Sequence, residues 1–353
     1  MRWFQALILG LPIAIVCRML DAPAWTIFLA SALALLPLAG WIGLGTEHVA
    51  TRLGSSLGGL LNATFGNAAE LIITIFALRR GLVDLVKASI TGSIIGNTLL
   101  ILGLSAVVGG TKHGVQRFNS KHTGHHAAMM ILALSAMALP AVFATVERDA
   151  WIREEVSIGV AILLLLTYAA YIYYSYFSRE SHSEKAPEAQ PHPGGRPWSL
   201  AKALGVLAGA VLGTVVASEL LVHVIEPVSK SLGLTQFFVG LIVIPIIGNV
   251  AEHYGAITFA RRNQMELSIS IAANSSTQIA MFVAPFLVLA SLVVAPTPMN
   301  LIFQPIELVT LFASAAIFAY VSLDGETNWL EGVQLLALYL IAAIAFYFLP
   351  GAL

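Results

Sequence analysis

Two short segments of the chain carry the same unusual combination of residues. "GNAAE" covers residues 66–70 and "GNVAE" covers residues 248–252, and both lie in otherwise apolar sequence. A charged group at the centre of a membrane helix costs on the order of 3 kcal/mol, so Glu70 and Glu252 are candidates for function. The alternative is that either carboxylate lies near a water-filled helix end, and the repetition of the whole motif argues against it.

The glycine and the asparagine of each motif are also informative. Asn67 and Asn249 precede the glutamates by three residues, so we expect asparagine and glutamate to share one helix face. Gly66 and Gly248 allow a helix to break at this point. Carbonyl groups freed by such a break are tolerated inside a membrane only where they line a cavity or bind something. The motifs therefore predict two broken helices that contribute polar groups to one site.

Polar residues recur in the next apolar stretch after each motif. "TGSIIGN" places Ser93 and Asn97 four residues apart, and "NSSTQIA" places Ser275 and Gln278 three residues apart. Each pair forms one polar stripe on a helix. Hydrogen bonding between neighbouring helices is the alternative use for such residues. Together with the two glutamates, the stripes would complete a ring of oxygen atoms.

A ring of this kind has a definite chemistry. Two carboxylates, amide and hydroxyl oxygens and free carbonyls suit calcium, which takes about six to eight oxygen ligands, better than zinc or copper. Two carboxylates in a water-poor cavity repel each other, so the cavity holds either a divalent cation or protons, but poorly both. Competition of this sort is the physical basis of antiport.

The composition shows where these residues must lie. The 353 residues are 58% hydrophobic and only 10% charged, whereas soluble domains are about 45 to 50% apolar. A net charge of -1 leaves no basic field for nucleic acid. The sequence therefore predicts an all-α, polytopic protein whose main partner is the lipid bilayer.

Eleven apolar runs are candidates for membrane spans. We read the first run as a retained helix because it lacks a small-residue cleavage site. It holds the single cysteine, Cys17, so disulfides play no part. The runs are residues 3–20, 24–43, 57–78, 85–108, 126–146, 155–177, 201–225, 236–259, 267–294, 302–322 and 329–349.

The spans divide into two sets of five after the first helix. We expect an extra helix over 1–22, a first unit over 23–177, a polar linker over 178–199 and a second unit over 200–353. Units of five helices enter the membrane in opposite senses, which is typical of inverted repeats in transporters. A shift of 182 positions superposes the two motifs, including Glu70 on Glu252.

The charges in the loops predict an orientation. With a cytoplasmic N-terminus, eleven of the 18 Lys and Arg residues fall on the cytoplasmic side, as the positive-inside rule favours. The compact chain suggests a prokaryotic inner membrane.

In these motifs the sequence resembles the calcium/proton exchanger (CAX) family. "GNAAELIITIFAL" and "GNVAEH" resemble its two repeat motifs, and "NSSTQIAMFVAP" is similar to the stretch after its second motif. The resemblance implies a first helix plus two inverted five-helix repeats, with Glu70 and Glu252 as exchange carboxylates and calcium and protons as the transported ions. No cofactor is implied. The implied supporting residues are Asn67, Asn249, Ser93, Asn97, Ser275 and Gln278.

The sequence leaves two possible roles for each of two further residues. His253 resembles the family's histidine beside the second glutamate, and it either relays protons or hydrogen-bonds a neighbour. Glu219 lies inside the seventh run, either as a secondary ion residue or as a buried structural partner.

Other functions remain as alternatives to calcium/proton exchange. One is an exchanger driven by sodium or potassium, and another is a cation channel. A channel would not require an inverted pair of carboxylates. An intramembrane metalloenzyme is disfavoured because no HExxH or comparable ligand set occurs in a span, so we expect no enzyme.

Overall fold

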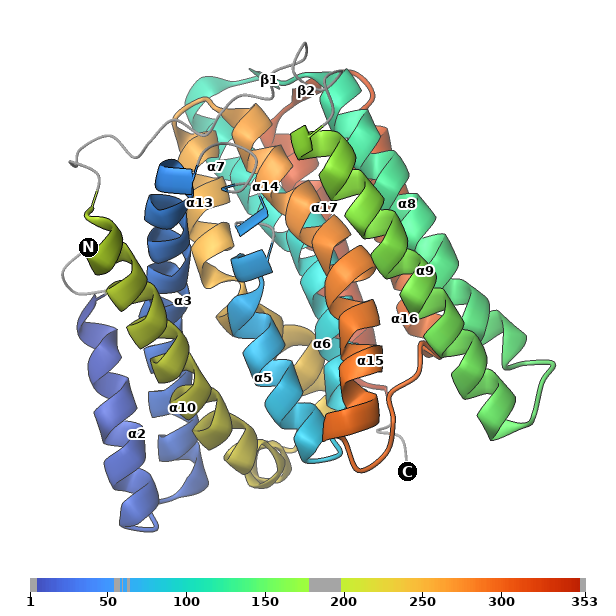
Figure 1. Cartoon of the computed structure of the whole chain (residues 1–353). Helices are drawn as coiled ribbons and strands as arrows, with labels where there is room; N and C mark the ends of the chain where they lie inside the picture. The colour runs from blue at the N-terminus through green and yellow to red at the C-terminus, as the bar shows by residue number, and fades with distance from the viewer. Residues whose placement is uncertain (1–4, 54–57, 59, 62–63, 178–197, 350–353) are drawn as a thin grey trace.

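The structure is a computed structural model, and it describes residues 5–53, 58, 60–61, 64–177 and 198–349. These residues form a bundle of long helices that run up and down past one another (Figure 1). The elements of the first half are η1 Leu7–Leu9, α2 Gly10–Met19, α3 Ala24–Leu53, α5 Ala68–Arg79, α6 Val83–Ile95, η2 Gly96–Ile101, α7 Leu102–His113, β1 Gln116–Arg117, α8 Ser120–Phe143 and α9 Ala150–Phe177.

The second half follows after residues 178–197, so most of the predicted linker lies outside the described residues. Its elements are α10 Leu200–Leu232, α11 Gln236–Phe238, η4 Val239–Val243, α12 Ile244–Gly248, α13 Val250–Arg261, α14 Met265–Gln278, η5 Ile279–Val283, α15 Ala284–Val294, α16 Pro305–Val321, β2 Glu326–Thr327 and α17 Trp329–Tyr347.

The helices are long and apolar, as a membrane protein requires. Seven continuous helices in the described part of the chain could cross a membrane, and α11–α13 make an eighth if that bent pair is one span. The prediction of a helical membrane protein is therefore confirmed. The count of eleven spans stays a prediction, because the helices over Leu7–Met19 and Pro305–Val321 are shorter and part of the predicted run 57–78 lies outside the described residues.

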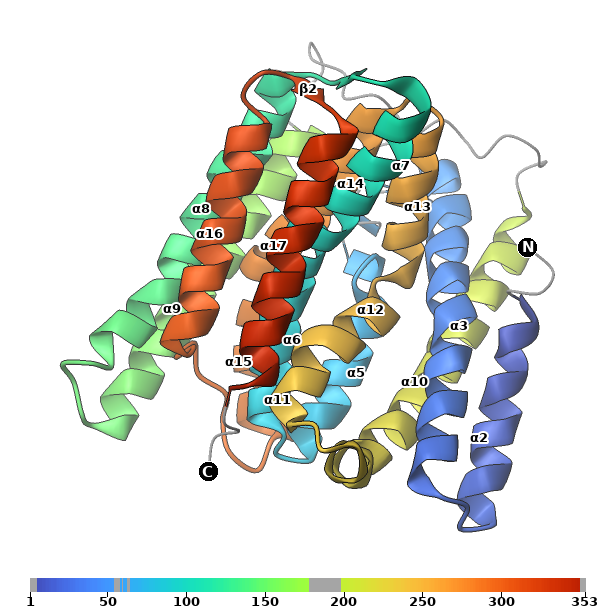
Figure 2. The ribbon, with the colours of Figure 1, turned by 180° about the vertical axis from the view of Figure 1, so that it is seen from behind.

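Helices from the two halves pack directly against each other. α10, from the second half, lies along α3 and α5 of the first half at one side of the bundle (Figures 1 and 2). On the other side, α15 packs against α9, α14 against α8 and α16 against α6. This interleaving brings α5 and α6 next to the elements of the second motif.

Two glycines permit a close contact between α6 and η4. A Cβ atom added at Gly92 in α6 would overlap the carbonyl group of Leu241, and one at Gly240 would approach the carbonyl oxygen of Leu85. Small residues allow backbones to approach in this way in membrane bundles. The crossing of α6 and η4 therefore depends on glycine on both sides.

Both polar stretches run into π-helical turns. η2 follows α6 and η5 follows α14, and they lie at corresponding positions in the two halves. Wide turns of this type occur mostly as single insertions in α-helices and often at functional sites. They mark the same place in each half as the polar stripes.

A short pair of strands closes one end of the bundle. β1 and β2 are antiparallel, with Gln116 opposite Thr327. Gln116 also donates to the carbonyl oxygen of Ala260 at 2.9 Å and to Asn263 Oδ1 at 3.0 Å. The loops of the two halves are thus joined to the end of α13.

Candidate functional site

The asparagines of the two motifs have nearly the same backbone angles, each just before a helix begins. α12 ends at Gly248 and α13 begins at Val250, with a bend of 63° between the two parts of the span. Asn249 stands in the break at φ −99° and ψ 11°. In the first half Asn67 precedes α5 at φ −97° and ψ 14°. The same sequence therefore gives the same local backbone twice.

The glutamates lie at helix starts rather than at helix centres. Glu70 is in the first turn of α5, and Glu252 is in the first turn of α13. The free N–H groups at a helix N-terminus carry a partial positive charge, which stabilises a carboxylate. Asn67 and Asn249 sit at the breaks, as N-cap residues, instead of on one continuous helix face as expected from the spacing. The break leaves them outside the regular helix.

Glu70 is held by residues from both halves of the chain. Its side chain is buried, and Oε1 accepts hydrogen bonds from the hydroxyl of Ser93 and from Asn249 Nδ2, the latter at 2.5 Å. Asn249 Nδ2 also lies 3.2 Å from Ser93 Oγ. A Cβ atom on Gly248 would lie 2.7 Å from Glu70 Cγ. The second motif therefore packs directly onto the carboxylate of the first.

The remaining polar residues also form hydrogen bonds between the halves, with the donors in the first half and the acceptors in the second. Asn67 Nδ2 donates to Gln278 Oε1 at 2.6 Å. Asn97 Nδ2 donates to Ser275 Oγ at 2.9 Å. Ser275 lies beside the Glu252 carboxyl group, which in turn interacts electrostatically with Glu70. The structure thus brings together the two glutamates and all six supporting residues that the sequence singles out.

Three oxygen atoms in this cluster lack a partner among the described residues. They are Asn67 Oδ1, Glu70 Oε2 and Glu252 Oε2, all buried. Buried acceptors without partners are costly, and native structures contain few of them. Three such oxygens in one cluster suit a ligand that accepts lone pairs, which is a cation.

The donor set narrows the choice of cation. The described residues hold no group of three or more His, Cys, Asp and Glu side chains that could bind a metal ion. The cluster offers two carboxylates and otherwise neutral oxygens, a set that suits a hard cation such as calcium rather than zinc.

Other predicted residues lie at the edge of this cluster or outside it. His253 follows Glu252 and is partly exposed, and no described residue hydrogen-bonds its ring. Gly66 is exposed, whereas its counterpart Gly248 is buried. Glu219 is exposed on α10, so it is not a buried structural partner.

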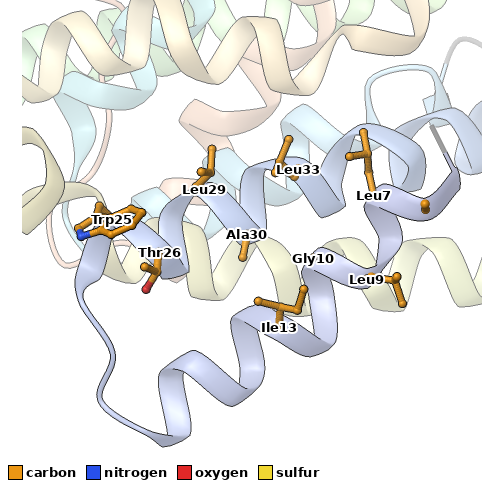
Figure 3. A pocket seen from close by; sticks show the side chains of 10 residues that line it. Leu7, Leu9, Gly10, Ile13, Trp25, Thr26, Leu29, Ala30 and Leu33 are labelled. Atoms are coloured by element: carbon orange, nitrogen blue, oxygen red, sulfur yellow. The ribbon is translucent and has the colours of Figure 1, made fainter. Parts of the chain in front are cut away.

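A groove elsewhere in the molecule has different chemistry. It lies between α2 and α3, has a volume of about 340 Å³ and is lined by apolar residues such as Leu9, Ile13, Trp25 and Leu29 (Figure 3). Thr26 supplies the single side-chain hydroxyl of its lining. Such a surface offers no charge to an ion, so the polar cluster remains the candidate site.

Some residues that place the site are not evident from the motifs. Gly92 and Gly240 set the close crossing that brings α6 to the second half. Their signal in the sequence is weak, because glycine is common in membrane helices. Nothing in the sequence alone indicates which backbone each one contacts.

Comparison with known proteins decides the family. The profile of the family described as "Sodium/calcium exchanger protein" matches residues 23–177 and 202–348. The chain belongs to this exchanger family. A Ca(2+)/H(+) antiporter of Aphanothece halophytica is 41% identical to it, over 98% of this chain and 96% of the relative. The Ca(2+)/H(+) antiporter ChaA of Bacillus subtilis (strain 168) is 39% identical, over 96% of this chain and 97% of the relative.

The solved structure of native YfkE shares the fold of this exchanger. Its TM-score is 0.85 at 37% sequence identity, and the match covers 98% of this chain and all of that one. The resemblance to exchangers that the motifs indicate is therefore confirmed at the level of family and fold.

Proposed function

We propose that this protein exchanges calcium for protons across a membrane by alternating access, at a site built around Glu70 and Glu252. The observation that carries the proposal is the meeting of the two motifs, in which Gly248 and Asn249 contact Glu70. The relatives named Ca(2+)/H(+) antiporter, at about 40% identity over nearly the whole chain, support calcium and protons as the exchanged ions.

The charges of the site explain why the two ions would alternate. Two carboxylates in a buried cluster cannot both stay ionised without a counter-charge. A calcium ion supplies that charge directly, and protons supply it by neutralising the carboxyl groups. Because either ion satisfies the site, each one displaces the other, and a gradient of one can drive transport of the other.

The hydrogen bonds indicate how the site would change on calcium binding. Asn249 now directs its NH2 group at Glu70 Oε1, and an NH2 group cannot ligate a cation. Calcium at this carboxylate requires Asn249 to turn its amide oxygen toward the ion or to move away. The unpaired oxygens of Asn67, Glu70 and Glu252 would then complete the coordination.

The arrangement of the halves supports alternating access. We propose that residues 23–177 and 200–353 form inverted five-helix repeats, that residues 1–22 add a helix before them and that 178–199 is a linker. Similar helix breaks before Glu70 and Glu252 support this division. We place the N-terminus in the cytoplasm and the protein in a prokaryotic cell membrane, in keeping with its bacterial relatives.

Calcium flux into proteoliposomes tests the function. An imposed pH gradient should drive calcium against its own gradient, and a sodium or potassium gradient without a pH gradient should not. Uphill calcium transport driven by a sodium or potassium gradient alone would show that this ion, and not the proton, is exchanged for calcium. Flux that only dissipates a calcium gradient would indicate a channel.

Competition at the site gives a second test. Lowering the pH on both sides of the membrane should weaken calcium binding, because protons then occupy the carboxylates in its place. Calcium affinity that does not change between pH 8 and pH 6 would contradict a shared site for the two ions.

A further inference from the structure

Another buried carboxylate lies on the opposite side of α6 from the exchange cluster. Glu307 is in the first turn of α16 and is 1% exposed. Its Oε1 accepts a hydrogen bond from Thr91 Oγ1 at 2.8 Å, and its Oε2 accepts one from the backbone N–H of Gln304 at 2.8 Å. Both oxygens are therefore in use, one for capping α16 and the other for holding α6.

Lys87 makes a second connection from the same face of α6, one turn before Thr91. Its Nζ donates to Asn300 Oδ1 at 2.7 Å and to the carbonyl oxygen of Ile302 at 2.9 Å. It also interacts electrostatically with Glu307. Lys87 and Thr91 thus attach α6 to the segment 300–307 at two points.

Ser93, the residue that donates to Glu70, is only two positions after Thr91 in α6. Residues two apart on an α-helix point to nearly opposite sides. One side of α6 is therefore fixed to α16 through Thr91, while the other side presents Ser93 to Glu70. A buried hydrogen bond to a carboxylate keeps its geometry only if the helix that carries the donor does not shift.

The residues at the corresponding positions of the second half cannot make the same attachment. With the shift of 182 positions, Lys87 and Thr91 correspond to Ile269 and Ala273 in α14, and both are apolar and buried. α14 packs against α8 there, at the position of the contact between α6 and α16. Lys87 and Thr91 of the first half therefore have no polar counterparts in α14.

We infer that Glu307, with Thr91 and Lys87, is a positioning residue that holds α6 so that Ser93 meets Glu70. The inference rests on the proposed function, because its effect is expressed as calcium affinity at the Glu70 site. It assigns no direct contact with the ion to Glu307.

The test compares two threonines on the same stretch of helix. Thr91→Val removes the bond to Glu307, and we expect the calcium concentration for half-maximal transport to rise about fivefold, with an unchanged maximal rate. Thr91→Ser keeps the hydroxyl and should restore the original value. Thr98→Val is the matched control, because Thr98 is equally buried and its hydroxyl bonds only to carbonyls of its own helix, Ile94 and Ile95.

A double-substitution cycle shows whether the effect passes through Ser93. In a Ser93→Ala background, Thr91→Val should change calcium affinity by less than about twofold, because the bond that it positions is already absent. Glu307→Gln should weaken affinity at least as much as Thr91→Val, since an amide cannot accept both hydrogen bonds.

Several results would overturn the inference. They are an unchanged affinity in Thr91→Val, an equal loss in Thr98→Val, or effects of Thr91→Val and Ser93→Ala that simply multiply. These outcomes are distinct from a failure of the proposed function, in which Glu70→Gln itself would retain proton-driven calcium transport.

Discussion

Glu70 and Glu252 occupy equivalent positions in two copies of one motif, yet their surroundings differ. Glu70 is 4% exposed and accepts hydrogen bonds from Ser93 and Asn249, which come from different halves of the chain. Glu252 is partly exposed as a residue, its Oε2 is buried without a partner among the described residues, and Ser275 lies beside its carboxyl group. The glycines differ in the same way, since Gly248 is buried against Glu70 while Gly66 is exposed.

This difference shows what a repeat does and does not determine. The motif fixes the local backbone, and both breaks have nearly identical angles at the asparagine. It does not fix what surrounds each carboxylate, because two equivalent halves can pack so that one carboxylate is more enclosed than the other. In an alternating-access cycle, closure of the site would pass from one side of the membrane to the other. The surroundings of each carboxylate would then change with the conformational state, whereas the motifs are fixed by the sequence.

The largest expected effect comes from removing either charge. Glu70→Gln and Glu252→Gln should each reduce proton-driven calcium transport by about 100-fold or more, because one carboxylate cannot balance a desolvated dication. Despite their different surroundings, the two variants should be equally inactive. Uptake in vesicles at matched protein level measures this, with Glu226→Gln as a control for an exposed carboxylate on α10 that pairs with Lys230. Substantial transport by one Gln variant would make that glutamate structural.

Much of the site could be predicted from the sequence, because its members are polar residues in apolar runs. Glu70, Asn97 and Gln278 stand out for that reason alone, and the shift of 182 positions indicates that the two sets belong together. The pairing could not be predicted. Asn67 bonds to Gln278 instead of Glu252, and that choice depends on how the start of α5 lies relative to the end of α14, which the local sequence does not determine.

The long helices could likewise be predicted, since about 20 apolar residues suffice for a span. The residues at which these helices end could not be predicted. α3 and α10 run to 30 and 33 residues, well beyond the apolar stretches, because helices continue past the hydrocarbon region into polar sequence. The attachment of α6 through Lys87 and Glu307 could not be predicted from the sequence either, since the residues that bond to each other are 213 to 216 positions apart.

Ser93 and Ser275 provide a further test of the difference between Glu70 and Glu252. Ser93→Ala should weaken calcium affinity about tenfold, because Glu70 is buried and water cannot replace the lost bond. Ser275→Ala should weaken it only about threefold, since the Ser275 hydroxyl accepts a hydrogen bond from Asn97 and, unlike Ser93, makes no short hydrogen bond to its glutamate. The calcium dependence of uptake measures both.

Ser276→Ala is the control for these variants, because the Ser276 hydroxyl is buried and bonds to its own helix at Ala272. Equal losses in Ser93→Ala and Ser275→Ala would mean that the two carboxylates are equivalent in the working protein and that the difference in burial has no energetic consequence.

A smaller effect is expected from filling the space beside Glu70. Gly248→Ala places a methyl group 2.7 Å from Glu70 Cγ, so the flexible side chain must shift by a few tenths of an ångström. Calcium affinity should fall about threefold, because the shift lengthens hydrogen bonds to Ser93 and Asn249. Gly255→Ala is the control, as its Cβ meets only Ile271 at an ordinary 3.7 Å. If both alanine variants bind calcium like the unmodified protein, Glu70 does not need its present position.

The smallest effect should come from making the two motifs more alike. His253 follows Glu252, and the corresponding residue after Glu70 is Leu71, so His253→Leu gives both halves the same side chain at this position. No described residue hydrogen-bonds the His253 ring, and we therefore expect transport at neutral pH to change by less than about twofold. The rate should keep its dependence on pH, since proton exchange at the two carboxylates does not require the imidazole. Transport rates measured from pH 6 to pH 8, beside those of the unmodified protein, check this. A His253→Leu variant that keeps calcium affinity but loses the acceleration by a pH gradient would make His253 a proton relay, and the second half would then differ from the first in chemistry as well as in surroundings.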